Sequence, residues 1–216
     1  IGITNGFKRK NRANDMSASL EETADIETAS DDYARRFAGP TGEWLLSVQE
    51  RITFDLLSRG PKGNVLDVGG GHGQLAFPLA RDGWDVTVAG SDESTANRIR
   101  PLLDAGRVKF QQANLISLPY PAKSFDHVIC FRYISHCSEW KQLVSELCRV
   151  ARVSVIIDYP PLFSWNLLTP LLFHVKKKLE GNTRTYTLFK HRELASLFAA
   201  DGFSKVERRG QFFLPM

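Results

Sequence analysis

The chain has 216 residues, of which 43% are hydrophobic, and its formal net charge is +4 at pH 7. This length and apolar content predict one α/β domain with a sizeable core. No apolar run is long enough to span a membrane, and no stretch has the pattern of a secretory signal. A charge excess of this size is more typical of a solvated surface than of a nucleic-acid-binding face.

The N-terminal 30 residues are polar and charged with little apolar periodicity, which predicts a mobile tail. Met16 opens the stretch "MSASLEETAD", so residues 1–15 are either sequence added for expression or a natural extension. The folded domain is expected over residues 31–216.

From residue 41 onward, short apolar runs alternate with segments that have helical apolar spacing. We expect helices at 41–60, 73–82, 93–104, 138–152 and 191–201, and strands at 64–68, 85–89, 107–110, 124–131 and 153–158. Residues 203–215 are expected to add one or two strands. This order predicts a doubly wound, Rossmann-like α/β fold with a mostly parallel, seven-stranded sheet covered by helices on both faces. Ligands bind such sheets beyond the carboxyl ends of the strands.

The stretch "VLDVGGGHGQLA" (65–76) joins the first strand to the next helix and holds four glycines in five positions. Glycine permits positive φ and lets a ligand approach the backbone closely. The amides of the loop would face that ligand near a helix N-terminus. A tight turn without a ligand needs fewer glycines, so the stretch favours a binding loop.

Two ligands fit this loop. The segment "GHGQLA" (71–76) matches the dinucleotide pattern G-x-G-x-x-A. The longer pattern Asp67-x-Gly69-x-Gly71-x-Gly73 places a carboxylate just before the loop. A carboxylate there suits a cationic ligand, because a dinucleotide pyrophosphate has the wrong sign.

With this motif the chain resembles the class I S-adenosylmethionine-dependent methyltransferases, most of all the type-11 group that acts on small molecules, over about residues 31–216. The resemblance implies S-adenosylmethionine as cofactor, S-adenosylhomocysteine as product, and in-line methyl transfer to a small acceptor. It extends to "QQANLISLPYPAKSFDHVICFRYISH" (111–136), which is similar to the segment around the family's third and fourth strands. The cofactor-binding residues that it implies are Asp67, Gly69, Gly70, Gly71, Gly73, Asp92, Asn114, Leu115, Phe131 and Arg132.

Within that set, Asn114 and Leu115 would contact the adenine, and Phe131 and Arg132 the methionine part. The family's usual ribose-binding acid, at the end of the second strand, falls on Gly90. Asp92 is therefore either a displaced ribose ligand or the N-cap of the next helix.

His136 is the candidate general base, because it follows the fourth strand on the side where the acceptor is expected. The competing interpretation is a structural histidine. Tyr33 and Arg36 either cover the cofactor or belong to ordinary surface. Asp158, in "DYPP", is expected to face the acceptor from the end of its strand.

An apolar and then basic insert is expected at about 159–182. Residues 162–180 are interpreted either as a packed helix with a solvated end or as a lid. The lid would cover a hydrophobic acceptor or touch an anionic membrane.

The chain has three cysteines, Cys130, Cys137 and Cys148, an odd number without metal-ligand spacing. This pattern predicts reduced thiols, no metal site and a cytoplasmic protein.

Three rival functions stay open. An NAD-binding oxidoreductase would use the glycine loop but leaves Asp67 unexplained. A nucleic-acid methyltransferase would need a basic face interleaved with aromatics, which the sequence does not show, so no nucleic-acid partner is expected. A non-catalytic S-adenosylmethionine-binding module would keep the fold without turnover. The sequence does not specify the acceptor or the oligomeric state.

Overall fold

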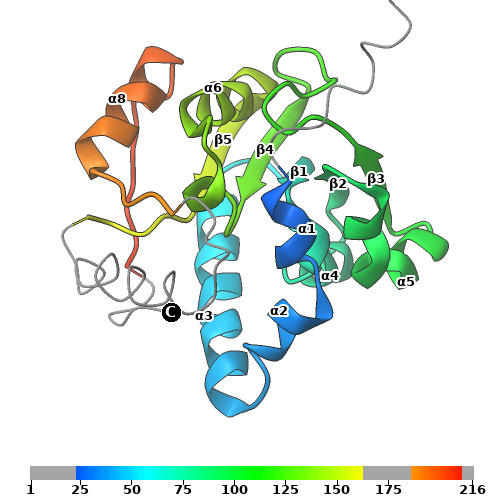
Figure 1. Ribbon diagram of the computed structural model, residues 1–216. Helices are drawn as coiled ribbons and strands as arrows, with labels where there is room; N and C mark the ends of the chain where they lie inside the picture. Colours follow the sequence, from blue (N-terminus) through cyan, green and yellow to red (C-terminus); the bar gives the residue numbers. More distant parts are fainter. Residues whose placement is uncertain (1–22, 163–185, 211–216) are drawn as a thin grey trace, which may run out of the picture.

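The computed structural model describes residues 23–162 and 186–210, and these form a parallel sheet flanked by helices (Figure 1). The strands are β1 (Asn64–Val68), β2 (Asp85–Gly90), β3 (Val108–Gln112), β4 (Phe125–Cys130) and β5 (Ala151–Ile157). Their order in the sheet is β3-β2-β1-β4-β5, and every neighbouring pair is parallel. The order reverses between β1 and β4, which makes the crevice at their carboxyl ends the expected ligand site.

The helical elements connect and cover these strands. They are α1 (Ala24–Thr28), α2 (Asp31–Arg35), α3 (Pro40–Leu57), α4 (Ala76–Arg81), α5 (Arg100–Asp104), α6 (Trp140–Val150) and α8 (His191–Ala200), with 3₁₀ turns η2 (Gly70–His72), η3 (Glu93–Ile99) and η4 (Ile134–His136).

Alternating strand side chains build a core on each face of the sheet. Val65 of β1 and Ile129 of β4 pack with residues of α3, α4 and η3. Leu66 and Val128, their neighbours in sequence, pack instead with residues of α6 and α8. Because both faces are buried, the strands read as nearly continuous apolar runs, and this is why they were visible in the sequence.

The predicted strands at 64–68, 85–89, 107–110, 124–131 and 153–158 are all present, with small shifts of their ends. The prediction of seven strands is not met: the sheet has five strands among the described residues. Residues 203–210, expected to be strand, form none. Charged side chains of this segment lie against α3 instead, where Arg209 pairs with Asp55 and Glu207 with Arg59. Residues 211–216 lie outside the described residues.

The N-terminal segment also differs from expectation. Residues 1–22 lie outside the described residues, but residues 24–28, predicted to belong to a mobile tail, form helix α1. Ala24, Asp25 and Thr28 of this helix are buried. Its docking against the glycine loop, rather than its own helix propensity, explains why α1 is ordered, because a five-residue helix is not stable alone.

The insert at 163–185 lies outside the described residues. No helix in the described ranges has the length and apolar content needed to cross a membrane.

Candidate functional site

The glycine loop leaves the carboxyl end of β1 at the crevice between β1 and β4. Gly69 and Gly73 adopt positive φ values of 73° and 78° on either side of η2, a conformation that glycine adopts at little cost. The four glycines thus turn the chain sharply from β1 into α4. The geometry confirms that the predicted loop stands at the carboxyl ends of the strands.

The two central glycines are required by packing. A Cβ atom on Gly70 would lie 2.0 Å from the carboxyl carbon of Asp67. A Cβ atom on Gly71 would lie 2.1 Å from the carbonyl oxygen of Thr95 in η3. Gly70 therefore makes room for the Asp67 carboxyl group, and Gly71 allows η3 to pack against the loop.

Asp67 is fully buried, and neither oxygen of its carboxyl group has a hydrogen-bond partner among the described residues. Burial disfavours the charged form and raises the pKa of Asp67 to about 7. A buried acid that is neither paired nor hydrogen-bonded is rare unless the site has a function. Asp67 is therefore a candidate binding group beside the loop.

His72, inside the same loop, supplies a hydrogen-bond donor. Its Nδ1 accepts a hydrogen bond from the backbone N–H of Gln74 at 3.1 Å. Burial, and the nearby positive charges of Arg132 and Arg98, lower the pKa of His72 to about 3. The neutral ring therefore carries its proton on Nε2, and this buried atom has no partner in the described part of the chain.

Arg132 follows β4 and is buried beside the loop, with 8% of its surface exposed. One terminal nitrogen donates to the side-chain oxygens of Gln49, at 3.0 Å, and Gln74. The guanidinium carbon lies 4.2 Å from the ring centre of Phe37. Its Nε is buried and has no hydrogen-bond partner among the described residues. The Arg132 guanidinium is thus fixed beside the glycine loop and keeps one N–H without a partner among the described residues.

Asp158, at the end of β5, holds Arg132 and Gln49 in place through hydrogen bonds. Its Oδ1 accepts a hydrogen bond from the backbone N–H of Arg132 at 2.6 Å, and its Oδ2 accepts one from Gln49 Nε2 at 3.4 Å. Burial raises the pKa of Asp158, while the bond from Arg132 and its charge act in the opposite direction. The cluster places Asp158 at the strand ends as predicted, but with both oxygens engaged by protein groups.

The remaining predicted residues divide between core and turn positions. Leu115 and Phe131 are buried in the two core clusters. Asn114 Oδ1 accepts a hydrogen bond from the backbone N–H of Ile116 at 3.1 Å, as in an Asx turn. Asp92 Oδ1 accepts one from Ser94 N at 2.9 Å and caps η3. Of the two interpretations of Asp92, the structure shows the cap.

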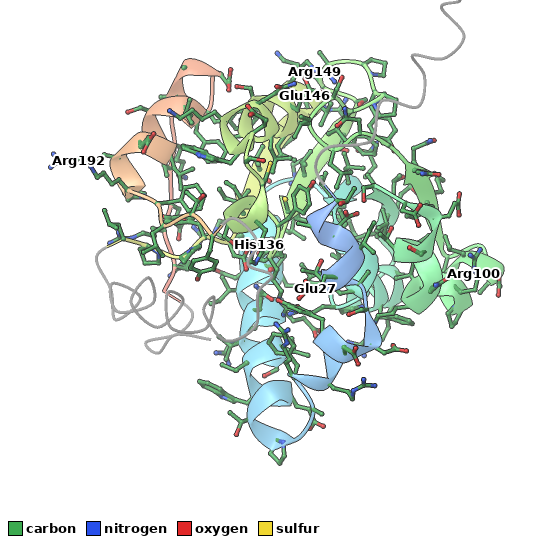
Figure 2. The ribbon with its side chains drawn as sticks, viewed as in Figure 1. Glu27, Arg100, His136, Glu146, Arg149 and Arg192 are labelled. Carbon is green, nitrogen blue, oxygen red and sulfur yellow. The ribbon has the colours of Figure 1, made fainter. Side chains whose placement is uncertain are left out.

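His136 lies in η4, near the middle of the view in Figure 2. It is half-buried, and its ring centre lies 5.6 Å from that of Tyr186. Tyr33 and Arg36, on and next to α2, reach the same region: the Arg132 guanidinium lies 5.9 Å from the Tyr33 ring centre, and that of Arg36 lies 5.1 Å from it. Aromatic and basic side chains therefore gather in this region.

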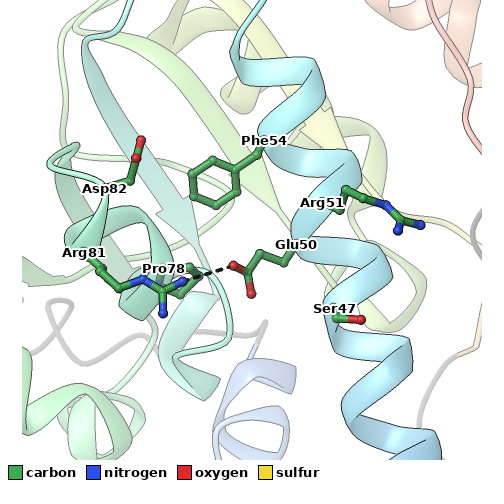
Figure 3. Close-up of a pocket in the computed structure, with 7 residues that line it drawn as sticks. All are labelled: Ser47, Glu50, Arg51, Phe54, Pro78, Arg81 and Asp82. Atoms are coloured by element: carbon green, nitrogen blue, oxygen red, sulfur yellow. Dashed lines mark ion pairs between the residues drawn. The ribbon is translucent and has the colours of Figure 1, made fainter.

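An open pocket of about 370 Å³ lies elsewhere, between α3 and α4 (Figure 3). Phe54 and Pro78 form part of its lining, and Glu50 and Arg81 form an ion pair of 3.5 Å across it. None of the predicted site residues lines this pocket. Within the described ranges, no group of three or more His, Cys, Asp or Glu side chains is arranged to hold a metal ion.

The family described as "Methyltransferase domain" matches residues 65–154, the segment that carries the glycine loop, Arg132 and His136. The chain belongs to the class I S-adenosylmethionine-dependent methyltransferases. A probable S-adenosylmethionine-dependent methyltransferase of Mycobacterium tuberculosis is 31% identical over 156 residues, which are 70% of this chain and 53% of that protein. The demethylmenaquinone methyltransferase of Deinococcus radiodurans is 28% identical over 160 residues, 65% of this chain and 64% of its own.

The fold of this methyltransferase is shared with solved structures. The magnesium protoporphyrin IX methyltransferase of Synechocystis PCC 6803, solved with bound SAH, matches with a TM-score of 0.60 and 20% identity over 79% of this chain and 83% of that one. This chain spans less than two thirds of the length of the two curated relatives above.

The polar atoms without partners around the loop include both acceptors and donors. Asp67 offers acceptors, whereas His72 and Arg132 offer donors. Sequence reasoning missed His72, Gln74 and Gln49 as parts of the site. His72 and Gln74 stand inside the quoted glycine stretch, so their position was a usable signal. Gln49, on a helix far from the motif, gave none.

Proposed function

We propose that this chain transfers a methyl group from S-adenosylmethionine to a small-molecule acceptor. The observation that carries the proposal is the buried Asp67 carboxyl group, which has no hydrogen-bond partner among the described residues and lies against the glycine loop. An isolated buried carboxylate costs several kcal/mol unless a cation or donor meets it. The ammonium group of S-adenosylmethionine is such a partner.

The donors beside the loop support the same ligand. Arg132 Nε and His72 Nε2 are suited to the carboxylate of the cofactor's methionine part. A dinucleotide would instead bring a pyrophosphate, with two negative charges, toward Asp67. The electrostatics therefore favour S-adenosylmethionine over the NAD-binding alternative.

Bound S-adenosylmethionine supplies a methyl group that its sulfonium has already activated. The remaining task of the chain is to hold donor and acceptor in line and to exclude water. We assign the first role to the loop residues Gly69–Gly73 with Asp67 and Arg132. Asn114, Leu115 and Phe131 are proposed to enclose the adenine and methionine parts, and His136 to take the proton of an acceptor hydroxyl or amine.

The acceptor is proposed to be a small molecule because one relative is named a demethylmenaquinone methyltransferase. Residues 160–162 and 187–189 lie side by side, with Phe189 N donating to Pro160 O at 3.0 Å and Leu162 N donating to Phe189 O at 2.8 Å. The insert between them therefore starts and ends at one place beside the site. Its roles as a lid over a hydrophobic acceptor or as a lipid contact remain part of this proposal, as does a cytoplasmic location, which the three buried thiols support.

Calorimetry with S-adenosylmethionine, S-adenosylhomocysteine and NAD tests the cofactor. We expect both S-adenosyl compounds to bind and NAD to give no heat of binding. Tight binding of NAD with no S-adenosylhomocysteine binding would refute the proposal. Transfer of a labelled methyl group to compounds in a small-molecule extract, read by mass spectrometry, then separates an enzyme from a non-catalytic binding module.

A further inference from the structure

One buried side chain of helix α1, Asp25, is hydrogen-bonded to the residue that follows β2. The Asp25 carboxylate accepts hydrogen bonds from the backbone N–H of Ser91 at 2.7 Å and from its hydroxyl at 2.5 Å. Ser91 is the first residue after β2, so these donors stand at the carboxyl edge of the sheet. Asp25 is completely buried there, and Ser91 is 1% exposed. A segment 66 residues away in sequence thus occupies donors at the edge where a ligand must bind.

The same helix touches the glycine loop. A Cβ atom on Gly69 would lie 3.6 Å from the Asp25 Cβ and 3.4 Å from the Tyr133 ring, which is ordinary van der Waals contact. Figure 1 shows α1 and α2 lying past the ends of β1 and β2. In this arrangement α1 fills the space over the first glycine of the loop.

Besides this contact, α1 is held by packing, since Ala24 lies in the apolar core and Thr28 and Ala29 are buried. The helix has five residues, and the side chain of its N-cap residue, Thr23, makes no capping hydrogen bond. Two exposed ion pairs flank it: Glu27 with Arg36 at 3.5 Å, and Asp31 of α2 with Arg98 at 2.6 Å. Exposed pairs of this kind contribute little stability. The Asp25–Ser91 contact is thus a buried pair of hydrogen bonds that joins α1 to the residue after β2.

Breaking the Asp25–Ser91 hydrogen bonds would leave the two Ser91 donors without their acceptor. If α1 moved away, the buried N–H and hydroxyl of Ser91 would need a new acceptor, since an unsatisfied buried donor is costly. Asp25, in contrast, would gain hydration. A ligand oxygen entering the crevice can replace the carboxylate, so exchange of one acceptor for another links opening to binding.

We propose that α1 is an autoinhibitory strap: Asp25 holds it over the glycine loop through Ser91, and S-adenosylmethionine binds after α1 has moved and places an oxygen on the same Ser91 donors. This rests on the proposed function. The apparent affinity is the intrinsic affinity multiplied by the open fraction, so weakening the strap raises it.

The test compares Asp25→Ala with Glu27→Ala, which removes one carboxylate from the same helix without touching Ser91. We expect Asp25→Ala to bind S-adenosylhomocysteine about tenfold more tightly than the wild type. Glu27→Ala should stay within about twofold. Thermal melting checks that each variant is folded, and Asp25→Asn, which keeps the side-chain size, is the second variant if the alanine variant melts early.

Hydrogen exchange of residues 23–30 provides an independent readout. Exchange in the wild type should become faster when S-adenosylhomocysteine is added, because the strap is released. Weaker binding of S-adenosylhomocysteine by Asp25→Ala would show that Asp25 contacts the ligand. Unchanged binding would show that α1 does not cover the site. Either result overturns the strap alone, whereas no S-adenosylhomocysteine binding by any variant overturns the proposed function as well.

Discussion

Asp158 holds Arg132 in a left-handed backbone conformation. The carboxylate accepts the Arg132 backbone N–H at 2.6 Å, and Arg132 has a φ of 59°, which is uncommon for a residue other than glycine. This contact between the ends of β5 and β4 directs the Arg132 side chain toward Gln49 and Gln74. Such local strain persists only where the surroundings fix it, and it often marks a binding site.

Arg132→Gln should weaken the binding of S-adenosylhomocysteine by about 10- to 100-fold, because it removes a charge-assisted hydrogen bond to the ligand's carboxylate. Binding of 5′-methylthioadenosine, which keeps the nucleoside but lacks the amino acid part, should stay within about twofold. Calorimetry with both ligands measures the difference. Arg100→Gln, at an exposed position at the right-hand edge of Figure 2, is the matched control. Equal losses for the two ligands would place Arg132 away from the carboxylate.

Asp67 should make stability depend on pH in a defined direction. Its pKa in the folded protein is about 7, above the ordinary 3.8, so the folded state keeps a proton that the unfolded state releases. Between about pH 4 and pH 7 the free energy of unfolding contributed by this group therefore falls as pH rises, by up to about 1.4 kcal/mol per unit. Asp67→Asn has no titrating group at this position. Its unfolding free energy should therefore rise relative to that of the wild type as pH increases from about 4 to about 7.

The measurement is the difference in unfolding free energy between Asp67→Asn and the wild type at several pH values. A difference is needed because His72, whose pKa is lowered to about 3, has the opposite influence between about pH 3 and 6.5. Asp104→Asn, an exposed substitution, should follow the wild type. A difference that stays flat from pH 4 to 7 would contradict a buried neutral Asp67. In the same window, S-adenosylhomocysteine should bind the wild type more tightly as pH rises, because the ionised carboxylate favours its ammonium group.

The strands and the glycine loop could be predicted because their signals are local. Apolar runs buried on both faces, and a motif spanning seven residues, do not depend on distant parts of the chain. The contacts that complete the site join residues far apart: Arg132 with Gln49, and Asp25 with Ser91. Nothing in a polar N-terminal stretch indicates that one of its acids becomes buried. The terminal strands were overpredicted because β propensity in 203–210 did not reveal that its charges would pair with α3.

Gly71 tests whether the loop is constrained by packing or by the ligand. If only the ligand required this glycine, a side chain there would block the cofactor and leave the fold intact. The structure instead places a Cβ atom 2.1 Å from the backbone oxygen of Thr95. Gly71→Ala should therefore lose about 1–3 kcal/mol of stability as well as cofactor affinity. Gly210→Ala, where a Cβ atom meets nothing within 4 Å, is the control. Denaturant unfolding measures the stability, and a stable Gly71→Ala that fails to bind S-adenosylhomocysteine would show that the ligand, and not packing, requires the glycine.

Substitutions of Asp92 distinguish its role as the cap of η3 from a role as a ribose ligand. The Ser94 side chain, and then the hydrogen bond from the Ser94 backbone N–H that caps η3, lower the pKa of Asp92. Asp92→Ala should therefore lower the melting temperature by about 2–4 °C. It should change the affinity for S-adenosylhomocysteine by less than about twofold. Asp92→Ser keeps a capping oxygen without the carboxylate and should recover most of the lost stability. If both variants instead bind S-adenosylhomocysteine about tenfold more weakly while melting normally, Asp92 contacts the ribose, and the cap is secondary.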